Sequence, residues 1–167
     1  MSERKPSLLS SWKRQFWIPL RARSLSRTRS DIDRFGWQCL HVYPHAGEDG
    51  VGFTYTIGLW QTFGHPEIAV FGLARDTSHK ILSDCVDTIR VAGRYPLETP
   101  VIDVVANGIP VIFKAVRPDR LENCFGTAMR YYSGKSFEAV VLFWPNKQEV
   151  FPWDAPSSLQ EEGLGIV

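Results

Sequence analysis

Two strand-like segments joined by a short loop constrain the fold of this chain more than any other feature. Residues 53–58 (FTYTIG) alternate between large apolar side chains and threonine, which is the pattern of a half-buried strand. Residues 67–73 (EIAVFGL) are apolar on both faces, as is typical of a central strand. The loop between them carries Trp60, Phe63, His65 and Pro66. The pattern therefore predicts two adjoining strands with a rigid, aromatic corner.

Further strands follow from alternating or continuous apolar runs bounded by turn residues. We expect them at 37–43, 101–105, 111–116, 138–144 and 149–153. Strands occur in consecutive groups rather than in strict alternation with helices, which favours the α+β class. We expect a mainly antiparallel sheet of five to seven strands with two helices packed on one face.

Helix signals are found in three places. A short helical turn is expected after Ser30, ending at Gly36. A long helix is expected from Asp76, which can cap it, to Gly93, with one apolar stripe. The stripe consists of Ile81, Leu82, Cys85, Val86 and Ile89. A further helix is expected to begin at Pro118 and to end at Gly134.

Charge is distributed unevenly along the 167 residues, a length that suits one domain. Residues 1–30 hold eight basic residues against one acid, whereas residues 31–167 hold eleven against seventeen, so +7 and −6 leave the net +1. We expect a loosely ordered basic aromatic extension (1–30), one α+β domain (31–154) and a loosely held C-terminal tail (155–167). The extension could bind nucleic acid or an anionic membrane.

The motifs that the chain lacks weigh against the commonest nucleotide and hydrolase chemistries, but they leave enzymes of an unfamiliar type open. It has no nucleotide-binding glycine loop and no hydrolase signature, so we expect no cofactor. Its three cysteines form no Cys-x-x-Cys pair, and the spacing of Cys39, His41 and His45 fits no zinc pattern, so we expect no metal site. Reduced thiols and the absence of a signal peptide or membrane-spanning run favour a cytoplasmic protein.

The segment His65-Pro66-Glu67 is the first candidate site. Pro66 restrains the chain as it enters a strand, so the two flanking side chains would be held in place. Glu67 could orient an imidazole, bind a cation or pair with arginine. The alternative is that Glu67 caps backbone N–H groups while His65 only lines the turn.

His79, in the first turn of the long helix, is the second candidate. The positive end of the helix dipole favours a neutral imidazole that can exchange a proton, and Arg75 could add an anion site. Alternatively, His79 only hydrogen-bonds to a neighbouring loop. Tyr131 falls off the apolar stripe of its helix and is the aromatic side chain there most able to reach solvent.

A set of short motifs extends over about residues 32–154. The motifs are Gly36-Trp37, 53–59, 64–67, 71–73, His79, 108–110, Tyr131-Tyr132, Trp144-Pro145 and 151–153. Together they resemble the bacterial family called domain of unknown function 4262. The chain departs from the family at Asn146, where an acid usually follows Trp-Pro. The resemblance implies a domain without an established activity. Residues 56–59 and 66–68 are also faintly similar to suppressor-of-fused-like domains, some of which look like toxin-binding immunity proteins.

These observations leave two main functions open. The first is a small binding module that recognises a protein partner through the loop Leu59–Glu67, in immunity or regulation. Its acidic body could present complementary charge to a basic partner. The second is an enzyme or small-ligand binder whose site would use His65, Glu67 and His79, with Tyr55 or Trp60 as a stacking wall and Arg75 as an anion anchor. A closed pocket of these residues would favour the second function, and a flat aromatic patch would favour the first. The oligomeric state is not predicted.

Overall fold

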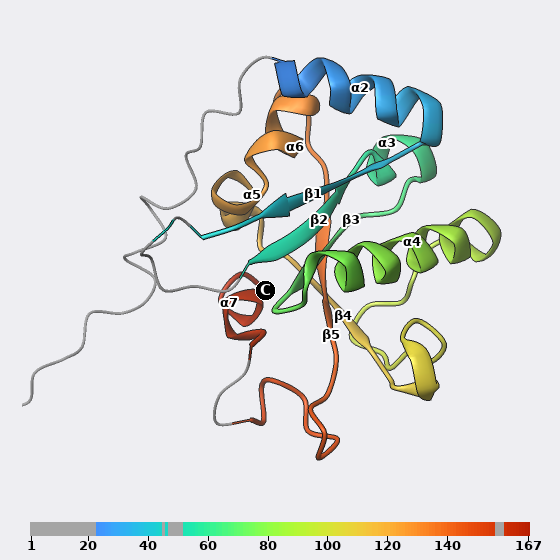
Figure 1. Ribbon diagram of the computed structural model, residues 1–167, viewed down its shortest axis with the longest axis vertical. Coiled ribbons are helices and arrows are strands. Elements are labelled where there is room, and N and C mark those ends of the chain that lie inside the picture. Colours follow the sequence, from blue (N-terminus) through green and yellow to red (C-terminus); the bar gives the residue numbers. More distant parts are fainter. Residues whose placement is uncertain (1–22, 45, 47–51, 156–158) are drawn as a thin grey trace, which may run out of the picture.

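The computed structural model describes residues 23–44, 46, 52–155 and 159–167. The strands among them form a five-stranded sheet in the order β1-β2-β3-β5-β4 (Figure 1). They are β1 (Gln38–Val42), β2 (Phe53–Ile57), β3 (Glu67–Phe71), β4 (Ile112–Ala115) and β5 (Ala139–Phe143). Neighbours pair antiparallel except β3 and β5, which are parallel, so the sheet is mixed. The expected α+β class is confirmed.

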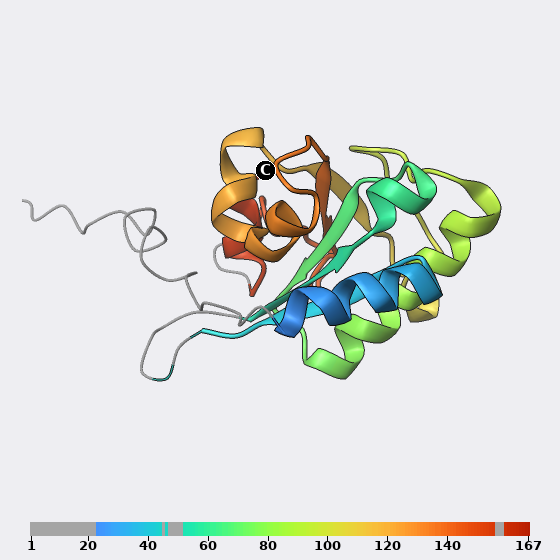
Figure 2. The same cartoon turned by 90° about the horizontal axis from the view of Figure 1, so that it is seen from above.

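Helices cover both faces of this sheet, whereas we expected two helices on one face. They are α2 (Arg23–Phe35), α3 (Leu59–Phe63), α4 (Arg75–Ala92), α5 (Pro118–Cys124), α6 (Gly126–Tyr131) and α7 (Glu161–Leu164), with a 3-10 turn, η2 (Ala106–Gly108). Helix α4 lies on one face, and α5, α6 and α7 lie on the other (Figure 2). Because every residue of β2, β3 and β5 is buried, both faces need cover.

The core consists of two apolar layers, one on each face of the sheet. On one face, Tyr55 and Phe71 of the sheet pack in the same cluster as Phe125. On the other, Ile68 and Leu142 pack in the same cluster as the α4 stripe, every member of which is buried as expected. Helix α4 also ends before Gly93 as expected, but Ala74 rather than Asp76 occupies its N-cap.

The helix expected from Pro118 to Gly134 is two helices, α5 and α6. The break is at Phe125, whose φ of −115° and ψ of 39° are not helical. Its side chain is fully buried and contacts Tyr55 edge to face, with ring centroids 4.9 Å apart. The apolar stripe expected here consists of Leu121, Phe125, Ala128 and Tyr132, of which all but the half-buried Leu121 are buried. The stripe thus predicted the buried side of the segment but could not reveal that Phe125 interrupts the helix.

Helix α2 begins at Arg23, well before the Ser30 start that we expected, so the last part of the basic extension is helical. It lies across the end of the sheet near α3 and α6 (Figure 1). Ile32 is buried in the core, and Gly36 follows the helix with a φ of +85°. The expected contacts of residues 1–30 with nucleic acid or membrane fall mostly outside the described residues.

The C-terminal residues 159–167 pack against the core through Gly163 and Ile166, although we expected a loosely held tail. Gly163 of α7 packs against Phe71 and Val141 of the sheet, and Ile166 is buried. The backbone N–H of Arg117 donates to the carbonyl of Ile166 over 2.9 Å. The segment therefore completes the layer formed by α5 and α6.

Two expected strands do not form. Residues 149–153 form a bend and a turn without pairing, and residues 101–105 contribute only a single bridge between Val101 and Val111. Both segments lie beside β4, since Val111 directly precedes that strand and Lys114 within it contacts the ring of Trp153. None of the described helices is long and apolar enough to cross a membrane.

Substitution of Gly72 by alanine should reveal how tightly the C-terminal segment is docked. Both Gly72 (φ +77°) and Gly134 (φ +76°) adopt the left-handed conformation, so alanine should cost roughly 1 kcal/mol at either position. A Cβ at Gly72 would also lie 2.5 Å from the carbonyl oxygen of Leu159, whereas one at Gly134 meets nothing within 4 Å. We expect Gly72→Ala to lower the free energy of unfolding by about 1–3 kcal/mol more than Gly134→Ala, measured by urea unfolding. Equal losses would mean that residues 159–167 are loosely attached.

Candidate functional site

The carboxylate of Glu67 lies at the start of β3 and is fully buried. One oxygen accepts hydrogen bonds from the hydroxyl of Tyr132, the backbone N–H of Gly58 (2.9 Å) and that of Trp60 (3.2 Å). The other accepts from the hydroxyl of Thr56 over 2.6 Å. Donors therefore surround both oxygens, as a buried charged group requires. This geometry matches the capping interpretation of Glu67.

Helix α3 replaces the loop that we expected at Leu59–Pro66. Gly58 (φ +109°) and Gly64 (φ +64°) bracket five helical residues, and their left-handed conformations allow the chain to turn sharply at both ends. The N–H groups at the start of the helix point at the Glu67 carboxylate, which satisfies donors that a helix N-terminus leaves open. So short a helix has no stable form by itself, which is why its sequence resembled a loop.

Thr56 connects the same carboxylate to the sheet. The pairing of β2 with β3 extends as far as Tyr55 and Ala69. Beyond that point, the N–H of Ile68 donates to the Thr56 hydroxyl over 2.9 Å, and that hydroxyl donates to Glu67. Thr56 is therefore buried and hydrogen-bonded, whereas the alternating pattern of residues 53–58 predicted a strand buried on one face only.

Burial governs how Glu67 titrates. Removal from water raises the pKa of Glu67 from 4.5 to about 6, against the opposing effect of its hydrogen-bond donors. The pKa of the Tyr132 hydroxyl is raised as well, by burial and by the adjacent carboxylate. Tyr132 therefore stays protonated and keeps donating to Glu67.

His65 is also buried, and both of its ring nitrogens are engaged. Its Nε2 lies 3.3 Å from the backbone N–H of Tyr95, which can only donate, and its Nδ1 lies 2.6 Å from the carbonyl of Pro66, which can only accept. The imidazole is therefore neutral with its proton on Nδ1. Burial lowers its pKa and favours this neutral form.

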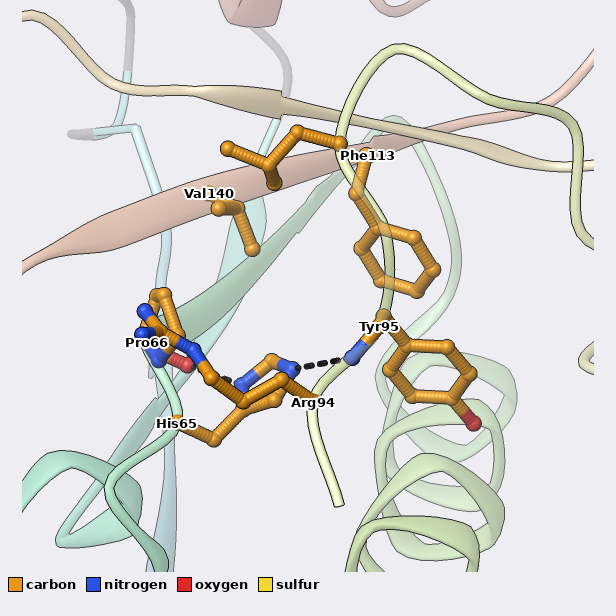
Figure 3. Close-up of a pocket in the computed structure, with 7 residues that line it drawn as sticks. His65, Pro66, Arg94, Tyr95, Phe113 and Val140 are labelled. Carbon is orange, nitrogen blue, oxygen red and sulfur yellow. Dashed lines mark hydrogen bonds between the residues drawn. The ribbon is translucent and has the colours of Figure 1, made fainter. Parts of the chain in front are cut away.

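A small pocket of about 210 Å³ opens beside His65 (Figure 3). Its lining is His65, Pro66, Arg94, Tyr95, Leu97, Phe113 and Val140. Most of these side chains are apolar or aromatic. The charged member, Arg94, is half exposed and pairs with Glu138 over 2.9 Å. Neither Glu67 nor His79 is among the lining residues, so the three candidates do not share this pocket.

His79 and Arg75 lie elsewhere, at the N-terminal end of α4 beside β1. The His79 ring stacks on Trp37 with centroids 6.1 Å apart. Burial, together with the nearby Arg75 and His79 charges, lowers the pKa of His41, which hydrogen-bonds to Thr54 over 2.8 Å. Among the described residues, no group of three histidine, cysteine or acidic side chains could hold a metal ion. His45 of the expected triplet lies outside the described residues.

The remaining candidates are positioned for packing. Tyr55 is buried in the core, so its ring is not available as the wall of an open site. Trp60 is partly buried against the same cluster. The hydroxyl of Tyr131 donates to the side chain of Gln61 over 3.2 Å, which connects α6 to α3.

Three residues that complete the pocket were not among the expected site residues. They are Arg94, Tyr95 and Leu97, which follow the glycine that ends α4. The available signal was an aromatic and a large aliphatic residue around Pro96, in a turn that would otherwise be polar.

Removal of the Tyr132 hydroxyl should destabilise the fold markedly. Tyr132→Phe takes one donor from a buried carboxylate, so we expect a loss of about 1.5–3 kcal/mol in the free energy of unfolding. The matched control is Tyr131→Phe, which removes an exposed hydrogen bond and should cost less than about 0.5 kcal/mol. Urea unfolding of both variants measures the difference. Similar effects of the two substitutions would contradict the central role of Glu67.

The titration of Glu67 should appear in the pH dependence of stability. The folded state raises the pKa of Glu67, so the protonated side chain stabilises the fold. Its contribution to the free energy of unfolding is complete below pH 4.5 and falls by about 2 kcal/mol as the pH rises through 6. The variant Glu67→Gln has no ionisable group at this position. The unfolding free energy of the wild type minus that of Glu67→Gln should therefore decrease by about 2 kcal/mol between pH 4 and 7. The histidines titrate in both proteins, so their effect on the difference cancels. A difference in unfolding free energy that does not change with pH would refute the raised pKa of Glu67.

Comparison with known proteins gives a family but no activity. No protein with curated annotation and no solved structure matches this chain significantly. The sequence model described as Domain of unknown function (DUF4262) matches residues 31–158, from the C-terminal half of α2 to just before α7. That span contains the buried Glu67 and the whole His65 pocket. The chain therefore belongs to the DUF4262 family.

Proposed function

We propose that this protein is a recognition module that binds a protein partner, and that the pocket beside His65 receives one apolar side chain of that partner. The observation that carries the proposal is the pocket itself, walled by Leu97, Phe113 and Val140 at the end of the segment Leu59–Glu67. Leu97 is 45% exposed at its rim. Small, apolar, well-defined pockets are where interfaces place their anchoring side chains.

Pocket size favours a side chain over a free ligand. Sites for small molecules usually enclose about 300–1,000 Å³, and this pocket is about 210 Å³. Its polar lining is also largely engaged, because both His65 nitrogens bond to backbone groups and Arg94 pairs with Glu138. Few polar groups remain to orient a small molecule.

The alternative, an enzyme built on His65, Glu67 and His79, receives less support. Glu67 is buried beneath four hydrogen-bond donors, and His65 is neutral with both nitrogens engaged. His79 stacks on Trp37, outside the lining of the pocket. General acid–base catalysis needs such groups within reach of one substrate.

A displayed library of random peptides provides a defined probe of the pocket. Leu97→Asp puts a charge at the rim without disturbing a fully buried side chain. The matched control is Ile102→Asp, at a side chain that is 61% exposed and does not line the pocket. We expect selected peptides to carry a large apolar residue, and Leu97→Asp but not Ile102→Asp to weaken their binding about tenfold or more.

Thermal unfolding of both variants checks that the fold is retained. Failure to enrich any peptide above a blank surface would overturn the proposal. Equal effects of the two substitutions would overturn it as well, because binding would then not depend on the pocket.

A further inference from the structure

The surface beside the pocket joins the C-terminal ends of three helices. Arg90, in the last turn of α4, donates to the carbonyl of Phe35 at the end of α2 over 2.9 Å. The same guanidinium lies over the ring of Phe63, the last residue of α3, 5.7 Å from its centroid. His65 of the pocket follows Phe63 by two positions in the chain, so this surface and the pocket adjoin.

Apolar side chains on this surface are unusually open to solvent. Phe35 is 51% exposed and Leu97 is 45% exposed, although both are large and apolar. Single exposed apolar residues are common, but Arg90 holds the carbonyl of Phe35, and Leu97 lines the adjoining pocket. Together they give a partner more contact area than the pocket alone.

The charges on this surface differ from those of the domain as a whole. Residues 31–167 carry a net charge of −6, yet Arg34, Arg90 and Arg94 gather here. Two acids accompany them: Asp87 lies 3.6 Å from Arg90, and Glu138 lies 2.9 Å from Arg94. Both pairs are exposed, and exposed pairs are weak, so a partner's carboxylate can compete for either arginine.

We propose that the partner segment is acidic, with carboxylates next to the apolar side chain that enters the pocket. The inference rests on the proposed function, because it names the chemistry of the partner at that same site. Arg94 lines the pocket and meets the carboxylate nearest the anchor, and Arg90 meets one further along. Arginine suits this role because its planar guanidinium can bond a carboxylate through two N–H groups. Charge complementarity of this kind mainly sets specificity and the rate of association.

Two synthetic peptides separate this inference from the proposed function. Both carry the same selected apolar anchor, flanked by glutamates in one peptide and by lysines in the other. Fluorescence anisotropy gives the Kd of each for the full-length protein at low salt. We expect the acidic peptide to bind about tenfold more tightly, with the preference shrinking as salt is raised.

Charge reversal identifies the residues responsible. Arg94→Glu should abolish or invert the preference for the acidic peptide, and Arg90→Glu should reduce it. Arg94→Glu is the primary variant, because Arg90 also donates to the Phe35 carbonyl and its loss could disturb the fold. Thermal unfolding checks that both variants retain the fold. The control is Lys80→Glu at the other end of α4, where Lys80 likewise pairs with an exposed acid, Asp84, at 2.8 Å. Lys80→Glu should leave the preference unchanged.

The outcomes are distinguishable. Equal binding of the two peptides, or a preference that survives Arg94→Glu, would overturn the acidic-partner inference while leaving the anchor pocket intact. An equal loss of preference in Lys80→Glu would also overturn it, because net charge rather than this surface would then be responsible. Both proposals would be supported if the wild type binds the acidic peptide more tightly and Leu97→Asp binds neither peptide.

Discussion

The fold depends on satisfying one buried carboxylate. Glu67 lies out of reach of water, and an uncompensated charge in such a place would cost several kcal/mol. No lysine, arginine or histidine among the described residues forms an ion pair with it. Its compensation comes from hydrogen-bond donors on β2, at the start of α3, and on Tyr132 at the end of α6. One side chain thus fixes the relative positions of segments that are distant in the sequence.

That constraint extends outward to the pocket. Glu67 anchors the start of β3, and its backbone N–H donates to the backbone carbonyl of Glu138, just before β5, over 2.9 Å. Pro66 and His65 precede it directly, so the imidazole is held where it can accept from the N–H of Tyr95. A buried polar network therefore supports one wall of a mostly apolar pocket. Such an arrangement suits a binding module, because a rigid pocket loses little conformational entropy when a partner docks.

Local patterns in the sequence predicted the framework well. The continuous apolar run of β3 and the stripe of α4 occupy the positions expected of them, because burial imposes a period that depends only on the element itself. The predictions that were wrong concern features that a local apolar period does not encode. Helix α3 needs the Glu67 cap, the break at Phe125 needs the Tyr55 ring, and α7 needs the face formed by Phe71 and Val141. Each is stabilised by a partner elsewhere in the chain.

The same distinction holds for the candidate site. The sequence by itself determined that His65 and Glu67 would be held rigidly around Pro66, since proline restricts the backbone locally. Only the tertiary structure decided what they do. Tyr132, 65 residues after Glu67, makes that carboxylate a structural centre, and Tyr95, 30 residues after His65, makes that imidazole a pocket wall. Hydrogen bonds over such separations leave no periodic trace in the sequence, because their geometry exists only once the two apolar layers have packed the sheet between them.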